Sequence, residues 1–261
     1  MNTTPLRRSG ALVAALASVS VLAACAGAPG IPGGRTTSSS LAERAIGAGD
    51  YETAAALYQQ AFEADPKSVD ALVGLGRSYT GMRQYDRAEK ALIEAQSRRP
   101  RDTAIQLELG RTQLAAGKPQ AALKNLEAAA ERSPRNLQAV TAHGIALDRM
   151  SRHKEAQEVY RAGLKRNPTD FALLSNLGLS LGLSGQTSEG IRILNELVRD
   201  NEASPRTRGN LALVYGLAGR DAEAAAMLKQ DLPPAQVQSN VAYYRELRAL
   251  LAQGKPIGAL Q

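Results

Sequence analysis

Cysteine and histidine, which often serve as nucleophiles, bases or metal ligands, occur only three times in this sequence, as Cys25, His143 and His153. A lone cysteine cannot form a disulfide within the chain. Neither histidine has a cysteine nearby or a partner at a metal-ligand spacing. We therefore expect both histidines to be structural, with His143 facing the core and His153 at a corner between two helices.

Longer catalytic motifs are also absent from the sequence. It contains no phosphate-binding loop, no dinucleotide-binding glycine pattern and no Gly-x-Ser-x-Gly turn. Its acidic residues are scattered and form no convincing pair for acid–base catalysis. The sequence predicts a protein that is not an enzyme and that uses neither a cofactor nor a metal ion.

The residues around Cys25 supply a different role for its thiol. Arg7 and Arg8 precede an apolar stretch over residues 11–22, which has the size of a signal-peptide core and is too short to span a bilayer. Leu22-Ala23-Ala24-Cys25 then resembles the bacterial lipobox, which implies cleavage before Cys25 and lipidation of its thiol. An ordinary secretory peptide with a chance cysteine is the alternative.

The segment after Cys25 predicts where the protein resides. Ala26 follows the cysteine, and resemblance to Gram-negative sorting rules implies an outer-membrane lipid anchor facing the periplasm. Residues 26–39 are rich in Gly, Pro, Ser and Thr without apolar periodicity. We expect residues 1–24 to be a signal peptide and residues 25–39 to be the lipidated cysteine with a flexible linker.

Charge and composition disfavour nucleic acid as a partner. The formal charge is +7, and Arg7 and Arg8 in the predicted signal peptide contribute two of these charges. The remaining excess is modest for a chain of this length. Aromatic residues make up only 4% of the chain and Trp is absent, so a core of closely packed helices rich in Ala, Leu and Gly is favoured.

A 34-residue repeat runs through the rest of the chain and predicts its fold. Prolines recur at this interval, alanines recur twelve residues before them, and small residues recur twelve residues before those. These three sets are Pro66, Pro100, Pro134 and Pro168; Ala54, Ala88, Ala122 and Ala156; and Ala42, Gly76, Gly110 and Gly144. Gly49, Gly117, Gly185 and Gly219, also spaced by multiples of 34, mark the turn between the two helices of their repeats.

This pattern resembles the tetratricopeptide repeat (TPR) over residues 40–232. The resemblance implies an all-α, right-handed superhelix, or α-solenoid, of about six helix-turn-helix repeats. Residues 233–261 then form a C-terminal tail whose helix, from about Ala235 to Gln253, caps the stack or binds a partner. The repeat register begins near Arg35, but Ser40 and Glu43 form a capping-box pattern that favours a shorter first helix from Ser40.

In TPR proteins the first helix of each pair lines a concave, protein-binding wall. The family's ligand-facing positions fall here on charged residues in the second to fourth repeats and on leucines in the fifth and sixth. These residues are Arg77, Arg111, Asp148 and Arg149, and Leu179, Leu183, Leu213 and Leu217. The leucines are expected to seat an apolar or amphipathic segment, unless the solenoid's curvature or its own C-terminal helix covers them.

Asn176 and Asn210 occupy the position at which clamp-type TPR proteins bind a carboxylate. They belong to the same candidate wall, but the paired lysines that such a clamp needs are missing. Contacts between helices are therefore the favoured role for both asparagines.

The whole layout resembles the TadD-type lipoproteins of tight-adherence (Flp) pilus assembly. The resemblance consists of the lipobox at Cys25, the uninterrupted repeats, and a tail that runs from Asp231-Leu-Pro-Pro to Ser239-Asn-Val-Ala-Tyr-Tyr-Arg-Glu-Leu-Arg248. It implies a pilotin-like factor that helps an outer-membrane secretin to assemble. The alternatives are another envelope TPR lipoprotein, such as a type IV pilus pilotin or an outer-membrane or peptidoglycan adaptor, and a soluble periplasmic scaffold.

Overall fold

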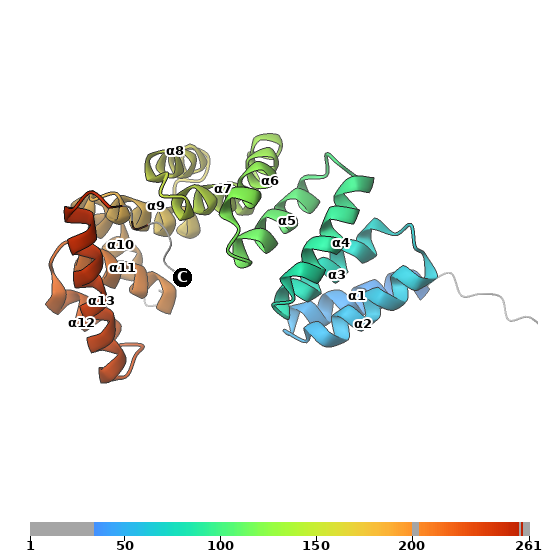
Figure 1. Ribbon diagram of the computed structural model, residues 1–261, viewed down its shortest axis with the longest axis horizontal. Helices are drawn as coiled ribbons and strands as arrows, with labels where there is room; N and C mark the ends of the chain where they lie inside the picture. The colour runs from blue at the N-terminus through green and yellow to red at the C-terminus, as the bar shows by residue number, and fades with distance from the viewer. Residues whose placement is uncertain (1–33, 200–203, 256, 258–261) are drawn as a thin grey trace, which may run out of the picture.

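The computed structural model describes residues 34–199, 204–255 and 257, and within these residues all regular structure is helical. Cys25, the predicted signal peptide and the first part of the predicted linker lie outside the described residues. The helices form six antiparallel pairs followed by one further helix (Figure 1). The predicted α-solenoid architecture is confirmed.

The first helices of the six pairs begin at intervals close to the 34-residue period. They are α1 (Gly34–Gly47), α3 (Val69–Gly81), α5 (Thr103–Ala115), α7 (Leu137–Arg149), α9 (Phe171–Leu183) and α11 (Pro205–Leu217). The second helices are α2 (Tyr51–Ala64), α4 (Tyr85–Arg98), α6 (Pro119–Arg132), α8 (His153–Leu164), α10 (Thr187–Val198) and α12 (Asp221–Leu228). The last helix is α13 (Pro234–Ala252).

Side chains that cap helix N-termini also recur every 34 residues. A Ser, Asp or Asn directly before a first helix accepts a hydrogen bond from an amide in the first turn of that helix. These caps are Ser68, Asp102, Asn136, Asp170 and Ser204. Together with the repeated prolines, which follow the second helices, they explain why each helix begins and ends in the same register.

The turn inside each pair uses a left-handed residue at the repeated glycine position. Gly49, Gly117, Gly185 and Gly219 all have positive φ, between 72° and 84°. In two repeats this position is occupied by Arg83 and Ser151, whose φ values are 58° and 59°. The conformation of the turn is therefore kept even where the residue type changes.

Helix α1 begins earlier than the capping-box pattern indicated. Its first residue is Gly34, six residues before Ser40, so that Ser40 lies inside the helix. Residues 34–39 are thus helical and do not belong to a flexible linker. The start agrees with the repeat register, which places it near Arg35, and α1 packs against α2 as the first helix of a pair.

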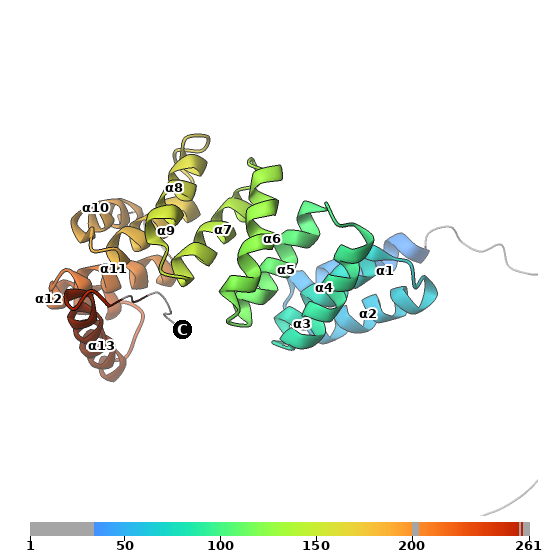
Figure 2. The same ribbon diagram turned by 45° about the horizontal axis from the view of Figure 1, so that its top comes forward.

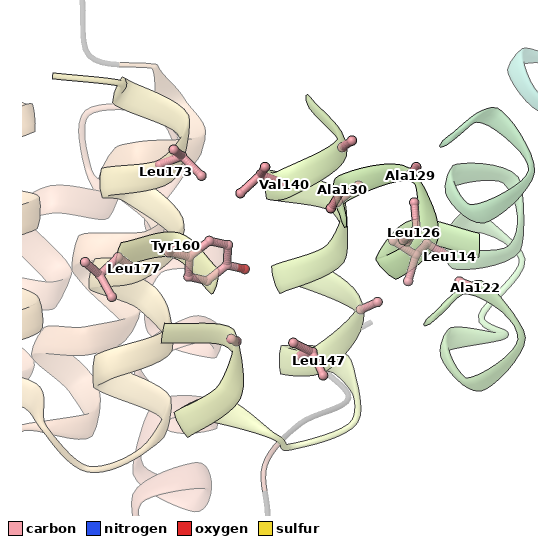
Figure 3. Packing of buried hydrophobic residues seen from close by; sticks show 14 of the residues in the cluster. Leu114, Ala122, Leu126, Ala129, Ala130, Val140, Leu147, Tyr160, Leu173 and Leu177 are labelled. Carbon is pink, nitrogen blue, oxygen red and sulfur yellow. The ribbon is translucent and has the colours of Figure 1, made fainter. Parts of the chain in front are cut away.

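The stack has no single central core. Each helix contacts only helices one or two places away in the chain, and the elements follow one another along a curved arch in both views (Figures 1 and 2). Apolar side chains fill the layers between helices, and Figure 3 shows Tyr160 of α8 extending toward the helix that carries Val140 and Leu147. Stability is therefore distributed over neighbouring interfaces, as in other solenoids.

Candidate functional site

The first helices of successive pairs form one wall of the arch. Helices α1, α3, α5, α7, α9 and α11 each contact the next member of this series, in addition to their own pair partners. Helices that contact each other in this way must line the concave side of a curved stack. We call the exposed faces of these six helices the inner wall.

Arg77 belongs to α3 of the inner wall, and its charge is already engaged in an ion pair. Its guanidinium is 2.6 Å from the carboxylate of Glu43, which also accepts a 2.5 Å hydrogen bond from the Tyr58 hydroxyl. Burial acts to raise the pKa of Glu43, but the hydrogen bonds from Arg77 and Tyr58 hold it below its usual value. These residues border a cavity of about 360 Å³.

The middle of the inner wall carries a groove of about 420 Å³ that combines apolar and charged groups. We call it the middle groove. Ile145 and Ala142 of α7 lie between Arg111 of α5 and Asp170, the cap of α9. The full lining is Arg111, Leu114, Leu137, Gln138, Thr141, Ala142, Ile145, Asp170 and Ala172. The Arg111 side chain is 52% exposed, and its guanidinium lies 3.6 Å from the carboxylate of Glu108 on the same helix.

Of the predicted site residues, only Arg111 lines this groove. Sequence reasoning missed Gln138, Thr141 and Ile145, although they occupy the same ligand-facing repeat positions as the residues that were chosen. The repeat register alone indicates these positions, whereas their residue types do not distinguish them from other inner-wall positions. Apart from Arg111 and Asp170, the residues that line the middle groove are uncharged.

Asp148 does not face a ligand, and this part of the prediction is wrong. Its carboxylate accepts hydrogen bonds from the Tyr160 hydroxyl at 2.9 Å and from the Ser180 hydroxyl at 2.6 Å, and it lies 2.8 Å from Nδ1 of His153. Burial and the adjacent carboxylate raise the pKa of Tyr160 well above its usual value, which keeps the hydroxyl protonated as a donor. Arg149, the next residue, is exposed.

The proximity of Ser180, His153 and Asp148 does not create a catalytic triad. In a triad the serine donates to the histidine, which then acts as the base. Here Ser180 is fully buried and donates to Asp148 instead, so the imidazole does not activate its hydroxyl. His153 is 8% exposed at the corner between α7 and α8, which agrees with its predicted structural role.

The predicted leucine surface is not open in this structure. Leu183, Leu213 and Leu217 are between 5% and 8% exposed, and Leu179 is partly buried against the same apolar cluster. That cluster also contains residues of α13 and Ile257 beyond it. The C-terminal part of the chain therefore covers the surface, which corrects the expectation of an exposed apolar seat.

The side-chain amides of Asn176 and Asn210 form hydrogen bonds within the stack. The amide of Asn210 donates to the Ser175 hydroxyl at 3.2 Å and links α11 to α9, which is the predicted contact between helices. The amide of Asn176 donates to the carbonyl of Ala172 at 2.7 Å, inside α9 itself. Neither arrangement forms a carboxylate clamp.

The described part of the chain offers no metal site and no membrane span. No group of three His, Cys, Asp or Glu side chains there is arranged to hold a metal ion. No helix among the described residues is both long and apolar enough to cross a bilayer. His143 is half-buried, and this burial lowers its pKa and favours the neutral imidazole.

Similar solved structures share this fold at low sequence identity. PilW, a widely conserved type IV pilus biogenesis factor, is 19% identical with a TM-score of 0.66, and the match covers 83% of this chain and 98% of PilW. A TPR protein from Parabacteroides merdae is 15% identical with a TM-score of 0.65, covering 85% of this chain and 86% of that protein. YrrB, described as a TPR protein with an unusual peptide-binding site, is 19% identical with a TM-score of 0.53, covering 65% of this chain and 88% of YrrB.

Sequence comparison identifies the repeats themselves. No curated protein sequence matches the chain. The family model of the tetratricopeptide repeat matches residues 45–109 and 113–178, which together make up half of the chain. The helical pairs and the inner wall of this chain agree with the match. The chain belongs to the tetratricopeptide repeat family, a family of protein-interaction scaffolds.

Proposed function

We propose that this protein is an outer-membrane lipoprotein that binds a segment of the Flp (Tad) pilus secretin in the middle groove and assists its assembly. The observation that carries the proposal is the groove itself. Its apolar floor at Ala142 and Ile145 lies between Arg111 on one side and Asp170 on the other. This combination suits a peptide segment that presents an apolar side chain flanked by charges.

Features outside the groove support the pilus assignment. The lipobox at Cys25 would hold the protein at the membrane in which a secretin assembles. The tail from Asp231 to Arg248 resembles that of TadD-type lipoproteins. The similarity in fold to a type IV pilus biogenesis factor is consistent with a role in pilus assembly.

In-cell photo-crosslinking tests the groove and the partner together. A photo-reactive residue in place of Ile145 or Gln138 should form adducts with the secretin, identified by mass spectrometry. Ile93 on α4 is the matched control, because it is a large apolar residue that is 50% exposed on a second helix. Arg111→Glu should lower the adduct yield from Ile145 about tenfold, since it reverses a charge at the edge of the groove.

Two results would contradict the proposal. Equal adducts from Ile93 and Ile145 would show that the groove is not the binding surface. Failure of labelled palmitate to enter the protein, or its persistence in Cys25→Ser, would contradict the lipid anchor.

A second candidate function follows from the same comparison. The match to PilW covers 83% of this chain, so the alternative is that this protein acts as a pilotin for a type IV pilus. Adducts from Ile145 to a type IV pilus component instead of the Flp secretin would decide in its favour. Adducts to outer-membrane assembly or peptidoglycan proteins would indicate an envelope adaptor.

A further inference from the structure

One edge of the arch collects positively charged side chains at a fixed repeat position. The loops that join one helix pair to the next contain the repeated proline, and in three consecutive loops a Lys or Arg follows it directly, namely Lys67, Arg101 and Arg135. Because the paired helices run antiparallel, these loops all lie at the same end of the pairs (Figures 1 and 2). The loops concerned are residues 64–68, 98–102, 132–136 and 164–170. We call this end of the pairs the basic edge.

The basic edge carries an excess of positive charge that the helices starting there do not neutralise. Its four loops contain eight Lys or Arg side chains and three Asp side chains. Of the described first helices that follow these loops, α5, α7 and α9 have no acidic residue in the first turn. At the opposite edge, α4, α8 and α12 do have such acids, and these pair with Lys118, Arg152 and Arg220. The two edges therefore differ in how much of their positive charge is compensated.

Arg101 and Arg135 illustrate the uncompensated charge. Both side chains are exposed, and neither forms an ion pair with an acidic residue of the described chain. They directly precede the caps Asp102 and Asn136, at helix N-termini, where the helix dipole favours negative charge. The stability of the stack therefore gives no reason for a cation at this position, and both charges are available to an external anion.

The chain enters the stack at the same edge. Helix α1 runs antiparallel to α2, so its first residue, Gly34, lies at the end of the pair where α2 ends. Gly34 is nine residues after Cys25, and nine residues span at most about 30 Å. A helix of the length of α1 adds about 20 Å before the opposite edge is reached. A lipid on Cys25 would thus bring the basic edge closer to the bilayer than the opposite edge.

We propose that the basic edge binds the anionic phospholipid headgroups of the membrane that holds the lipid anchor. Each Lys or Arg near an anionic bilayer strengthens the attraction about fivefold, and salt screens this attraction. The helices then stand upright on the bilayer, and the inner wall faces along the membrane plane toward proteins embedded in it. The inference rests on the proposed function, because it needs the anchor at Cys25.

Quenching by labelled headgroups in reconstituted vesicles tests which edge lies against the lipid. The full lipidated protein carries a fluorophore on one introduced thiol, since lipidation blocks the only native one. Thr169→Cys places the fluorophore on the basic edge, at the repeat position of Arg101, and Gln120→Cys places it at the opposite edge. Both positions are exposed. In phosphatidylethanolamine vesicles with about one-third phosphatidylglycerol, quenching should be about twofold stronger from Thr169→Cys, and about 0.5 M salt should remove the difference.

Charge reversal shows whether the basic edge itself makes the contact. Arg101→Glu combined with Arg135→Glu should abolish the difference in quenching. Glutamate suits a position before a helix N-terminus, so the fold should be retained, which circular dichroism checks. Arg83→Glu combined with Lys154→Glu is the matched control, because it changes the net charge equally at exposed residues of the opposite edge. The difference should persist in this control.

The outcomes separate this inference from the proposed function. Equal quenching at the two edges, or equal loss in the control variant, would overturn the basic edge, even with labelled palmitate on Cys25. A difference that persists in neutral phosphatidylcholine vesicles would overturn the role of charge. Absence of crosslinks from Ile145, with the difference in quenching intact, would contradict the middle groove and leave the membrane contact standing.

Discussion

Asp148 occupies an inner-wall position of its repeat, yet the side chains that hold it lie inside the stack. The residues one and two repeats away at the same position are Thr80, Leu114, Gly182 and Gly216, none of which carries a charge. In the fourth repeat the acid is turned inward by His153, Tyr160 and Ser180. The hydrogen-bond partners of Asp148 therefore determine where its carboxylate points, and its position in the repeat does not.

Asp148→Ala should lower the free energy of unfolding by about 2–4 kcal/mol, because it leaves buried hydroxyl and imidazole groups without their acceptor. Urea unfolding followed by circular dichroism measures this change. The adjacent Arg149→Ala is the control, and it should change the free energy by less than about 0.5 kcal/mol, since Arg149 is exposed. Equal effects of the two substitutions would show that the hydrogen bonds to Asp148 contribute nothing to stability.

The repeated small residues act at the scale of the helix pair. A Cβ atom on Gly76, Gly110 or Gly144 would lie 2.4 Å or less from a large side chain of the second helix. Those side chains are Leu92, Leu126 and Tyr160, one turn beyond the repeated alanines. A large side chain of the second helix, and not the repeated alanine, therefore fills the space above each of these glycines.

Gly110→Ala and Gly209→Ala should therefore change stability in opposite directions. A Cβ on Gly110 would lie 2.4 Å from Cγ of Leu126, so we expect a loss of about 1–3 kcal/mol from overpacking. A Cβ on Gly209 of α11 would meet nothing within 4 Å, so the higher helix propensity of alanine should add up to about 1 kcal/mol. Denaturant midpoints of the two variants measure both signs. A stabilised Gly110→Ala protein would show that the helix pair is not closely packed.

Most of the helix pattern could be predicted from the sequence because the repeat period is a local, redundant signal. The register places the turns even at Arg83 and Ser151, where glycine is missing but φ remains positive. The start of α1 shows the limit of a motif considered alone. The capping-box pattern indicated a start at Ser40 and the repeat register a start near Arg35. The helix begins at Gly34, close to the start that the register indicated.

The candidate site was less predictable because it depends on contacts between distant segments. Leu183 carries the signature of an inner-wall residue, but Ile257, 74 residues later, packs in the same cluster. No periodicity reports where a tail without repeats will fold back. Arg111, by contrast, is exposed and lines the middle groove together with residues of the next two repeats.

At the scale of the whole molecule, the tail sequence from Asp231 to Arg248 attaches α13 to the last repeat. Asp231 pairs with Arg208 of α11, while Arg245 and Arg248 both bind the carboxylate of Asp221, at 2.6 and 3.0 Å. Arg248 also donates to the carbonyl of Gly216 at 2.5 Å. These contacts hold α13 against the last repeat, so the tail motif specifies how the stack is closed.

Arg248→Ala should loosen one end of the stack and leave the other unchanged. It removes charged hydrogen bonds to Asp221 and Gly216 at a partly exposed site, so we expect a loss of about 1–2 kcal/mol. In a solenoid each unit is stabilised only by its neighbours, and a weakened cap therefore promotes opening of the adjacent repeat before distant ones. Hydrogen–deuterium exchange with mass spectrometry should show faster exchange in α11, α12 and α13 and no change in α1 to α4.

The matched control is Arg192→Ala, because Arg192 is 64% exposed and lies 3.5 Å from Glu196 within the same helix. This substitution should leave exchange unchanged in every helix, since an exposed pair of this kind contributes little. Faster exchange throughout the chain in Arg248→Ala would contradict independent neighbouring interfaces. It would instead show that the arch unfolds as one unit.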